Sequence, residues 1–373
     1  MVLRHAYGFD DVAIAPGEIT INPDMVDTTF DLAGTKFKIP FIASSMDAIV
    51  SPKFTSDLHE QGGLAVLNLN GLFCKYEETD QIFEDISKLS KNESTEFMQK
   101  IYNEPVKESL IRKRIQEIKS YGSKCAVATL PASTKKLIPL IQEEGADMLF
   151  VQSTVTTARH RSHSLKGLIF SEIKKMLKIP LIVGNTVSYT VTRELMEQGV
   201  DGILVGVGPG HACTSRETIG IGIPQISATM DCAKARNEYF KSTGKYVSVI
   251  TDGGIRTGGD VCKSMVSGAD AVMIGTPFAR TSESPGLGFN WGMATPDSNL
   301  PRGTRIKVGV ETDLKTLLYG PSNRTDGTLN LVGALKNCMG MIGADTLTDM
   351  HEAQMVYAPS IKTEGKIFQL GSG

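Results

Sequence analysis

The sequence lacks the features that mark several large protein classes. It has no long run of Lys or Arg, and its formal net charge of −2 supplies no basic stripe for a nucleic acid. No apolar run reaches the roughly 18 residues of a membrane-spanning helix. The N-terminus also lacks the charged-then-apolar layout of a secretory signal. We therefore expect a cytoplasmic protein that binds neither nucleic acid nor membranes.

Cysteine is scarce and scattered, which argues against a disulfide framework. The 373 residues hold 6 cysteines with no CxxC pair, and the 6 histidines form no HExxH pattern, so no metal-ligand cluster is indicated. Most of the cysteines stand in apolar surroundings typical of small core residues. The six are Cys74, Cys125, Cys213, Cys232, Cys262 and Cys338. Only Cys213 stands among glycines and polar side chains.

Short apolar segments of strand length alternate with helical stretches along the whole chain. Eight such segments are rich in Val, Ile and Leu, as expected for strands buried on both faces. They span residues 40–44, 64–67, 124–128, 148–151, 181–183, 202–205, 247–250 and 271–274. Eight strands with crossover helices predict an α/β fold, a (β/α)₈ TIM barrel. A doubly wound open sheet is the alternative, but its Gly-rich fingerprint is missing from the first strand.

The barrel is expected to form one domain over residues 1–370, with 371–373 (Gly-Ser-Gly) as a possible artificial tail. Two segments interrupt the regular alternation. Residues 87–109 are charged and predict an extra helical excursion between the second and third strands. Residues 280–328 separate the eighth strand from its helix and are rich in Pro, Gly, Asn and Asp. A loop of that length in a compact domain is usually functional, and we expect it to cover the barrel mouth as a flap.

Glycine-rich turns directly follow the later strands, at the barrel face where active sites are built. The turns after the seventh and eighth strands commonly form a phosphate cradle of backbone N–H groups. Glycine lets the backbone approach a phosphate closely, a threonine hydroxyl adds a donor, and an aspartate suits ribose hydroxyls. The residues concerned are Asp252, Gly253, Gly254, Gly275 and Thr276.

Cys213 lies in the glycine-rich loop after the sixth strand. A thiol becomes a nucleophile when it is exposed and partly ionised, and backbone amides and nearby Arg216 would favour the thiolate. The hydroxyls of Thr214 and Ser215 could orient a substrate or a water. These residues predict covalent catalysis by Cys213.

The loop GVGPGHACTSRETIGIGIPQ closely resembles the catalytic cysteine loop of IMP dehydrogenases and GMP reductases. The resemblance extends to Ser44-Ser45-Met46-Asp47, Gly184-Asn185, DGGIRTGGDV, GADAVMIGTPFA and Leu331-Val332-Gly333-Ala334-Leu335, and so spans almost the whole chain. The stretch between the second and third strands is too short for a CBS pair. The chain is therefore similar to the compact IMP dehydrogenase-related branch that lacks CBS domains.

The resemblance implies oxidation of IMP to XMP with NAD, in guanine nucleotide biosynthesis. Cys213 would attack purine C2, hydride would pass to nicotinamide, and water would hydrolyse the covalent thioimidate. Thr214 and Ser215 would assist near the base. The substrate residues would be Ser45, Met46, Asn185, His211, Asp252, Gly253, Gly254, Gly275, Thr276, Gly292 and Met293.

The same resemblance implies the remaining ligands. Gln152, Ser153 and Thr154 would lie near the nicotinamide ribose of NAD. The carbonyls of Gly208, Gly210 and Cys213 match a loop that binds K⁺. Family members suggest a homotetramer, or an octamer of paired tetramers.

The sequence departs from IMP dehydrogenases at the flap. Their Arg-Tyr pair, which helps activate the hydrolytic water, is missing, and the flap is shorter. Arg302 stands where relatives have Glu or Gln before a glycine. Our hypothesis is that Arg302 substitutes for the pair, with Thr214 relaying a proton. His211 replaces a small residue near the phosphate, where its imidazole could add charge.

Other functions stay open on the sequence alone. An NADPH-dependent GMP reductase shares the cysteine loop, although Arg302 at its Glu position argues against it. A purine-nucleotide-binding pseudoenzyme with a regulatory role is compatible with the missing Arg-Tyr pair. A flavin-dependent barrel oxidoreductase, with a similar phosphate cradle, is more remote.

Overall fold

The core of the computed structural model, which describes residues 3–161, 168–292 and 305–359, is a closed barrel of eight parallel strands. All eight predicted strands are present, which confirms the (β/α)₈ prediction. In barrel order they are β4 (Phe41–Ala43), β5 (Leu64–Asn68), β6 (Ala126–Thr129), β7 (Met148–Gln152), β8 (Leu181–Thr186), β9 (Gly202–Val205), β10 (Ser248–Asp252) and β11 (Ala271–Ile274). The barrel closes where β11 pairs with β4.

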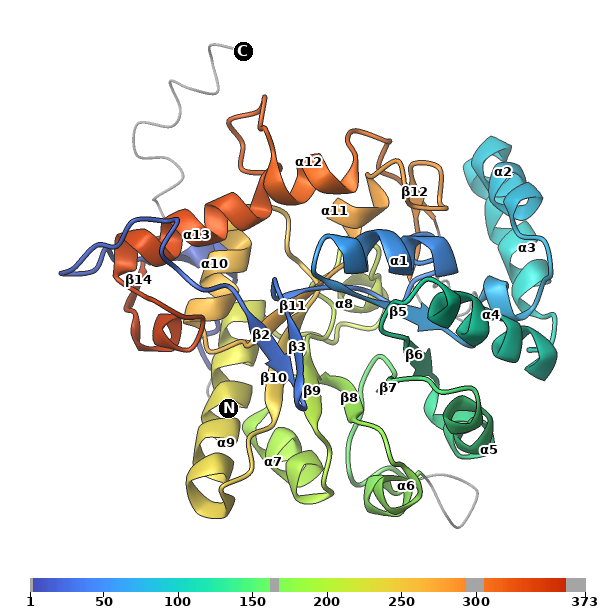
Figure 1. The fold of residues 1–373 in the computed structure, drawn as a ribbon, viewed down its shortest axis with the longest axis horizontal. Helices are drawn as coiled ribbons and strands as arrows, with labels where there is room; N and C mark the ends of the chain where they lie inside the picture. Colours follow the sequence, from blue (N-terminus) through green and yellow to red (C-terminus); the bar gives the residue numbers. More distant parts are fainter. Residues whose placement is uncertain (1–2, 162–167, 293–304, 360–373) are drawn as a thin grey trace.

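Helices follow the strands and surround the barrel (Figure 1). One main helix follows each strand and crosses over to the next, as right-handed β–α–β connections require. In order they are α1 (Pro52–Glu60), α4 (Glu108–Ser120), α5 (Pro131–Glu143), α6 (Phe170–Met176), α7 (Tyr189–Glu197), α9 (Gln225–Thr243), α10 (Gly258–Val266) and α13 (Leu331–Ile342). No helix among the described residues is long and apolar enough to cross a membrane.

Local sequence explains where these elements begin and end. The hydroxyl of Ser51 accepts a hydrogen bond from the amide of Phe54, and Pro52 occupies the first turn, so α1 begins there. The barrel strands are rich in apolar residues because both of their faces are covered; every residue of β5, β7 and β9 is buried. The core therefore lies inside the barrel and between the barrel and its helices.

The predicted excursion between the second and third strands is a pair of helices. They are α2 (Asp80–Lys88) and α3 (Lys91–Tyr102), which precede α4 and follow the 3₁₀ turn Leu72–Cys74. Ser90 and Glu93 form a capping box at the start of α3, which separates the two helices. Figure 1 shows the pair on one side of the barrel, beside α4. No CBS pair occurs between β5 and β6.

The long segment after β11 contains short elements rather than a simple loop. These are α11 (Thr276–Ala279), β12 (Phe289–Asn290), β13 (Ile306–Lys307) and α12 (Leu314–Tyr319). Strands β12 and β13 pair as an antiparallel hairpin stem. Residues 293–304, which join them, lie outside the described residues.

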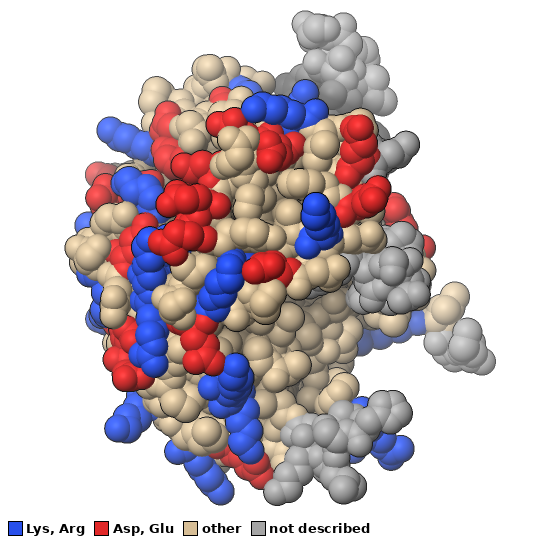
Figure 2. Space-filling view, turned by 90° about the vertical axis from the view of Figure 1, so that its right-hand side faces the viewer, with Lys and Arg blue, Asp and Glu red and all other residues tan. Residues whose placement is uncertain are grey.

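Further short elements complete the chain. Helix α8 (Ser215–Thr218) follows β9, and 3₁₀ turns span Phe9–Asp11 and Asp349–Glu352. Strand β1 (Val12–Ile14) pairs with β14 (Met355–Tyr357), which joins the two ends of the chain. The hairpin of β2 (Phe30–Leu32) and β3 (Thr35–Phe37) lies at the amino-terminal ends of the barrel strands. There the hydroxyl of Ser248, the first residue of β10, donates to the Asp31 carbonyl at 3.4 Å. Figure 2 shows acidic and basic side chains interspersed on one face.

Candidate active site

A cavity of about 920 Å³ opens at the carboxyl ends of the barrel strands. Loops that follow β4, β7, β8, β9, β10 and β11 all contribute to its wall, as expected for a barrel enzyme. The cavity brings together seventeen of the twenty residues predicted for the site. These are Met46, Gln152, Ser153, Thr154, Asn185, Gly208, Gly210, His211, Cys213, Thr214, Ser215, Asp252, Gly253, Gly254, Gly275, Thr276 and Gly292.

Among the described residues, one predicted residue, Ser45, is not on this wall. Ser45 is fully buried beneath it, and its hydroxyl donates to Gln152 Oε1 at 2.5 Å. The neighbouring Ser44 lines the cavity instead, so we correct the prediction for Ser45 to Ser44. Met293 and Arg302 lie outside the described residues, and their predicted roles stay predictions.

Cys213 is the exposed member of the six cysteines and faces the cavity. Cys74, Cys125, Cys232 and Cys262 are buried, and burial raises the pKa of the Cys125 and Cys232 thiols to about 12. Such thiols stay protonated and inert at neutral pH. Cys338 is half-buried on α13 and does not line the cavity. The structure thus agrees with the sequence in singling out Cys213 as the accessible thiol.

The loop after β9 holds Cys213 through short-range contacts. The amide of Cys213 donates to the Gly210 carbonyl at 3.0 Å, and its thiol lies 3.4 Å from the hydroxyl of buried Ser215. Arg216 does not line the cavity. Its guanidinium donates to the Ile223 carbonyl at 2.7 Å, so it holds the two ends of the loop together. In the described structure no contact joins Arg216 to the Cys213 thiol, so its predicted effect on the thiolate stays a prediction.

Asp252 and Asn185 meet across two strands at the floor of the cavity. The side-chain Nδ2 of Asn185 donates to Asp252 Oδ2 at 2.8 Å. Burial raises the pKa of Asp252 to about 6, and the hydrogen bond from Asn185 opposes that shift. The carboxylate is thus ionised at neutral pH and oriented by Asn185. It can accept hydrogen bonds from a ligand's hydroxyl groups.

The backbone after Asp252, where the sequence predicts a phosphate cradle, turns at two glycines. Gly253 and Gly254 adopt φ values of +90° and +80°, which are accessible to glycine but strained for other residues. They pack against Pro209 and Gly210, so the loops after β9 and β10 form one surface. Gly275 precedes α11, where Thr276 adds a hydroxyl that accepts a hydrogen bond from Asn290 at 3.3 Å.

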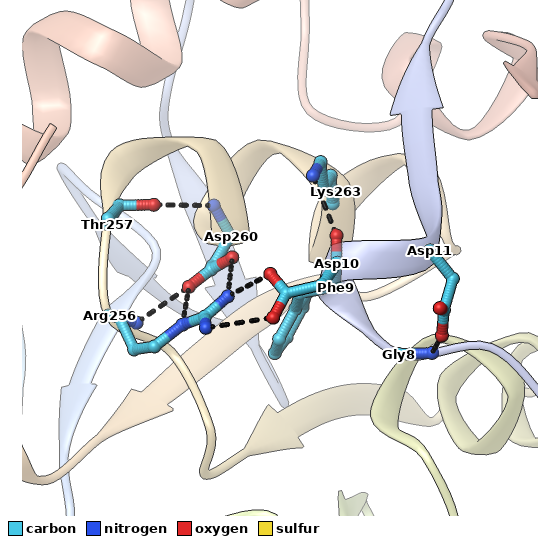
Figure 3. Close-up of polar contacts among 8 residues, drawn as sticks. All are labelled: Gly8, Phe9, Asp10, Asp11, Arg256, Thr257, Asp260 and Lys263. Atoms are coloured by element: carbon cyan, nitrogen blue, oxygen red, sulfur yellow. Dashed lines mark hydrogen bonds and ion pairs between the residues drawn. The ribbon is translucent and has the colours of Figure 1, made fainter. Parts of the chain in front are cut away.

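The cradle is fastened to the N-terminal segment (Figure 3). Arg256, two residues after Gly254, donates from Nε to Asp260 Oδ2 at 2.9 Å and from a terminal nitrogen to Asp10 Oδ1 at 2.7 Å. The amide of Arg256 also donates to Asp260 at 2.9 Å, and Lys263 Nζ donates to the Phe9 carbonyl at 2.7 Å. The loop after β10, the start of α10 and the N-terminal 3₁₀ turn therefore form one unit.

The residues predicted for the cofactor lie beside Asn185 on the same wall. The polar atoms of the Gln152 side chain are already hydrogen-bonded beneath the wall: Oε1 accepts from Ser45, and Nε2 donates to Met273 Sδ at 3.7 Å. Ser153 bonds the Thr156 hydroxyl at 2.8 Å. The Thr154 hydroxyl has no hydrogen-bond partner within the described parts of the chain and lines the cavity. Ser153 and Thr154 therefore suit the hydroxyl groups of a ribose, as the NAD prediction requires.

Metal sites are less well supported. Among the described residues no group of three or more His, Cys, Asp and Glu could hold a metal ion. One of the three carbonyls predicted for K⁺, that of Gly210, already accepts the Cys213 amide. The potassium site stays a prediction.

The irregular segment after β11 adds further residues to the cavity wall: Asn290 belongs to the segment Asn290-Trp291-Gly292-Met293 that the family resemblance implies for the base, whereas Arg280, Glu311 and Arg324 were not predicted. Asn290 lines the cavity and is 1% exposed, and its Oδ1 has no partner among the described atoms. Arg280 also lines it, 3.8 Å from Glu311, which in turn binds Arg324 at 2.5 Å. No periodic pattern marks these residues. For Arg280, Glu311 and Arg324 the only sequence signal was membership in a long, polar loop after the last strand.

The comparisons with known proteins point to one family. The family model "IMP dehydrogenase / GMP reductase domain" matches residues 6–294. An uncharacterized oxidoreductase of Mycolicibacterium smegmatis is 33% identical over 95% of this chain and 96% of its own length. An inosine-5′-monophosphate dehydrogenase of Cryptosporidium parvum is 28% identical over 92% of this chain and 89% of its own.

The likeness also holds in three dimensions. A crystal structure of an IMP dehydrogenase/GMP reductase-like protein from Corynebacterium glutamicum superposes with a TM-score of 0.90, at 30% identity over 95% of each chain. The family model covers the barrel strands, the cysteine loop and the cradle. This chain therefore belongs to the IMP dehydrogenase / GMP reductase family of oxidoreductases.

Proposed function

We propose that this protein oxidises IMP to XMP with NAD, through a covalent bond between Cys213 and purine C2. The observation that carries the proposal is the placement of an accessible thiol, an oriented carboxylate and a phosphate cradle in one cavity. A purine nucleoside monophosphate presents one partner for each of these groups: a base for the thiol, two ribose hydroxyls for the carboxylate and a phosphate for the cradle.

Each group has a definite task. Gly253, Gly254, Gly275 and Thr276 bind the phosphate through N–H and O–H donors. Asp252, held by Asn185, accepts from the ribose hydroxyls. The base then lies against the loop that carries Cys213, and Ser215 accepts the thiol proton's hydrogen bond and keeps the sulfur oriented.

The chemistry proceeds in two balanced stages. The Cys213 thiolate forms a bond to C2, and the hydrogen on C2 departs as hydride with both electrons of its bond. NAD, when bound against Ser153 and Thr154, supplies the acceptor for that hydride. Water then adds to C2, the carbon–sulfur bond breaks, and the thiol is regenerated as XMP leaves. Thr214, half-buried on the cavity wall, is the proposed proton relay; Arg302 is its proposed partner.

The proposal is tested by product analysis after incubation with IMP and NAD, and separately with GMP and NADPH. We expect XMP and NADH in equal amounts from the first mixture and no IMP from the second. Cys213→Ala should yield neither product, whereas Cys338→Ala, a matched change away from the cavity, should stay active. Conversion of GMP to IMP would instead assign a GMP reductase, and binding of IMP without any product would assign a non-catalytic nucleotide-binding protein.

A further inference from the structure

The cavity wall is braced from outside the barrel by a buried hydrogen-bond chain. Tyr102, the last residue of α3, donates its hydroxyl hydrogen to Asp47 Oδ2 at 2.6 Å. The same hydroxyl oxygen accepts the indole N–H of Trp291 at 2.7 Å. Asp47, Tyr102 and Trp291 are 3%, 8% and 1% exposed, so water does not compete for these bonds.

Each end of this chain adjoins a residue that faces the cavity. Asp47 follows Met46, which lines the wall after β4. Trp291 stands between Asn290 and Gly292, which line the wall at the end of β12. Tyr102 thus joins two parts of the wall that are separated by more than two hundred residues in sequence. It reaches them from a helix that the regular barrel does not contain.

Packing reinforces the same connection. The ring of Phe83, on α2, lies 6.0 Å from the Trp291 ring and 5.6 Å from Phe73. Arg305, which directly precedes β13, donates to the carbonyl of Leu89 at the end of α2, and its guanidinium lies 4.1 Å from the centroid of the Phe289 ring. The α2–α3 pair is therefore anchored to the β12–β13 stem at several independent points.

Asp47, the carboxylate of this hydrogen-bond chain, is costly to bury. Asp47 Oδ2 also accepts the amide of Leu72 at 3.1 Å, but Oδ1 has no partner among the described atoms. Burial raises the pKa of Asp47 to about 6, while the bonds from Tyr102 and Leu72 and the nearby Lys75 oppose the shift. A buried carboxylate is costly unless it is hydrogen-bonded, and here it serves as the acceptor that orients the Tyr102 hydroxyl.

We propose that Tyr102 is a positioning residue of the nucleotide site: by bridging Asp47 and Trp291, it fixes the relative positions of Met46 and Gly292, against which the purine base is held. The proposal rests on the proposed function, because it takes the ligand of this cavity to be a purine nucleotide. Tyr102 does not line the cavity and acts only through its two partners.

The single tryptophan of the chain provides a direct readout. We expect Tyr102→Phe, which keeps the ring and removes both hydrogen bonds, to change Trp291 emission in the ligand-free protein. We also expect it to weaken IMP binding and raise KM for IMP roughly 5- to 20-fold, with kcat changed less than about twofold. Asp47→Asn keeps an acceptor oxygen for Tyr102 and should restrict the rise in KM to about threefold.

Tyr76→Phe is the matched control. Its hydroxyl donates to the Ile101 carbonyl at 3.1 Å and so anchors the same helix α3, without contacting Trp291. We expect it to lower the unfolding temperature while leaving Trp291 emission and KM as in the parent. The proposal is overturned if Tyr102→Phe binds IMP with the parent's affinity and emission, or if Tyr76→Phe shifts both equally.

Calorimetric titration of the parent protein with IMP separates this inference from the proposed function. A parent that binds no IMP contradicts the proposed function, and with it this inference. A parent that binds IMP, together with a Tyr102→Phe variant that binds it equally well, contradicts only the role of Tyr102. Parent binding with a selective loss in Tyr102→Phe supports both.

Discussion

The side-chain Nδ2 of Asn185 donates a 2.8 Å hydrogen bond to Asp252 Oδ2 and thereby joins the ends of strands β8 and β10. These strands are not neighbours in the barrel, since β9 lies between them. The bond therefore fixes the geometry of the cavity floor across the loop that carries Cys213. It also leaves one carboxylate oxygen of Asp252 available for a ligand.

Nucleotide binding should depend on pH through Asp252. Its pKa is raised to about 6 by burial, so the carboxylate that we propose as the acceptor for ribose is lost as the pH falls through that value. We expect KM for IMP to be constant at neutral pH and to rise up to about tenfold per pH unit below the pKa. Asp252→Asn should show a raised KM that changes by no more than about threefold over the same range, the change expected from Asp47, whose pKa is also about 6. A parent KM that changes as little would contradict the role of Asp252.

Gly275→Ala should separate phosphate binding from folding. Gly275 has a negative φ of −106°, and a Cβ there would meet Met46 Sδ at 3.4 Å, an ordinary contact. The added methyl would point toward Met46 and Ser44, which both line the cavity, and so narrow the space that the proposal gives to the phosphate. We expect IMP affinity to fall about tenfold or more while the unfolding temperature and the affinity for inosine change little. Equal losses for IMP and inosine, measured by calorimetric titration, would place the phosphate elsewhere.

The two carboxylates that bind Arg256 should contribute very differently to stability (Figure 3). Asp10 and Arg256 are about half exposed, at 51% and 52%, so we expect Asp10→Ala to cost roughly 0–1 kcal/mol. The side chain of Asp260 is 4% exposed and accepts both the amide and the Nε of Arg256. Asp260→Ala should cost roughly 2–3 kcal/mol, because it removes a buried carboxylate that accepts both the backbone amide and the Nε of Arg256. Denaturant unfolding measures both, and comparable costs would show that the burial difference is unimportant.

The barrel could be predicted from the sequence because its strands are apolar on both faces. The first and last residues of the strands were less predictable where a side chain takes a backbone hydrogen bond that would otherwise join two strands. Residues 124 and 125 were predicted to begin the third strand, yet Cys125 is bound to the Asp147 carboxylate and backbone instead, and β6 begins at Ala126. At the opposite end, β8 continues to Thr186 and so carries Asn185 within the strand.

The site could be predicted where glycines and polar residues directly follow strands. It could not where the chain turns without a periodic pattern. After β4 the amide of Met46 donates to the Ser44 carbonyl at 2.7 Å, a tight turn that points Ser44 rather than Ser45 into the cavity. The Tyr102–Trp291 bond joins residues 189 positions apart, and each looks like an ordinary core aromatic in the sequence. Only the folded chain shows that they meet.

The most direct test of the central claim is a rapid-mixing experiment that follows NADH absorbance after the protein meets IMP and NAD. The account predicts a fast burst of about one NADH per subunit followed by steady turnover, with both phases absent from Cys213→Ala. A burst without turnover would support the covalent step and contradict hydrolysis by this site. NADH formation that survives Cys213→Ala, or no NADH from a parent protein shown to bind IMP, would contradict covalent oxidation by Cys213.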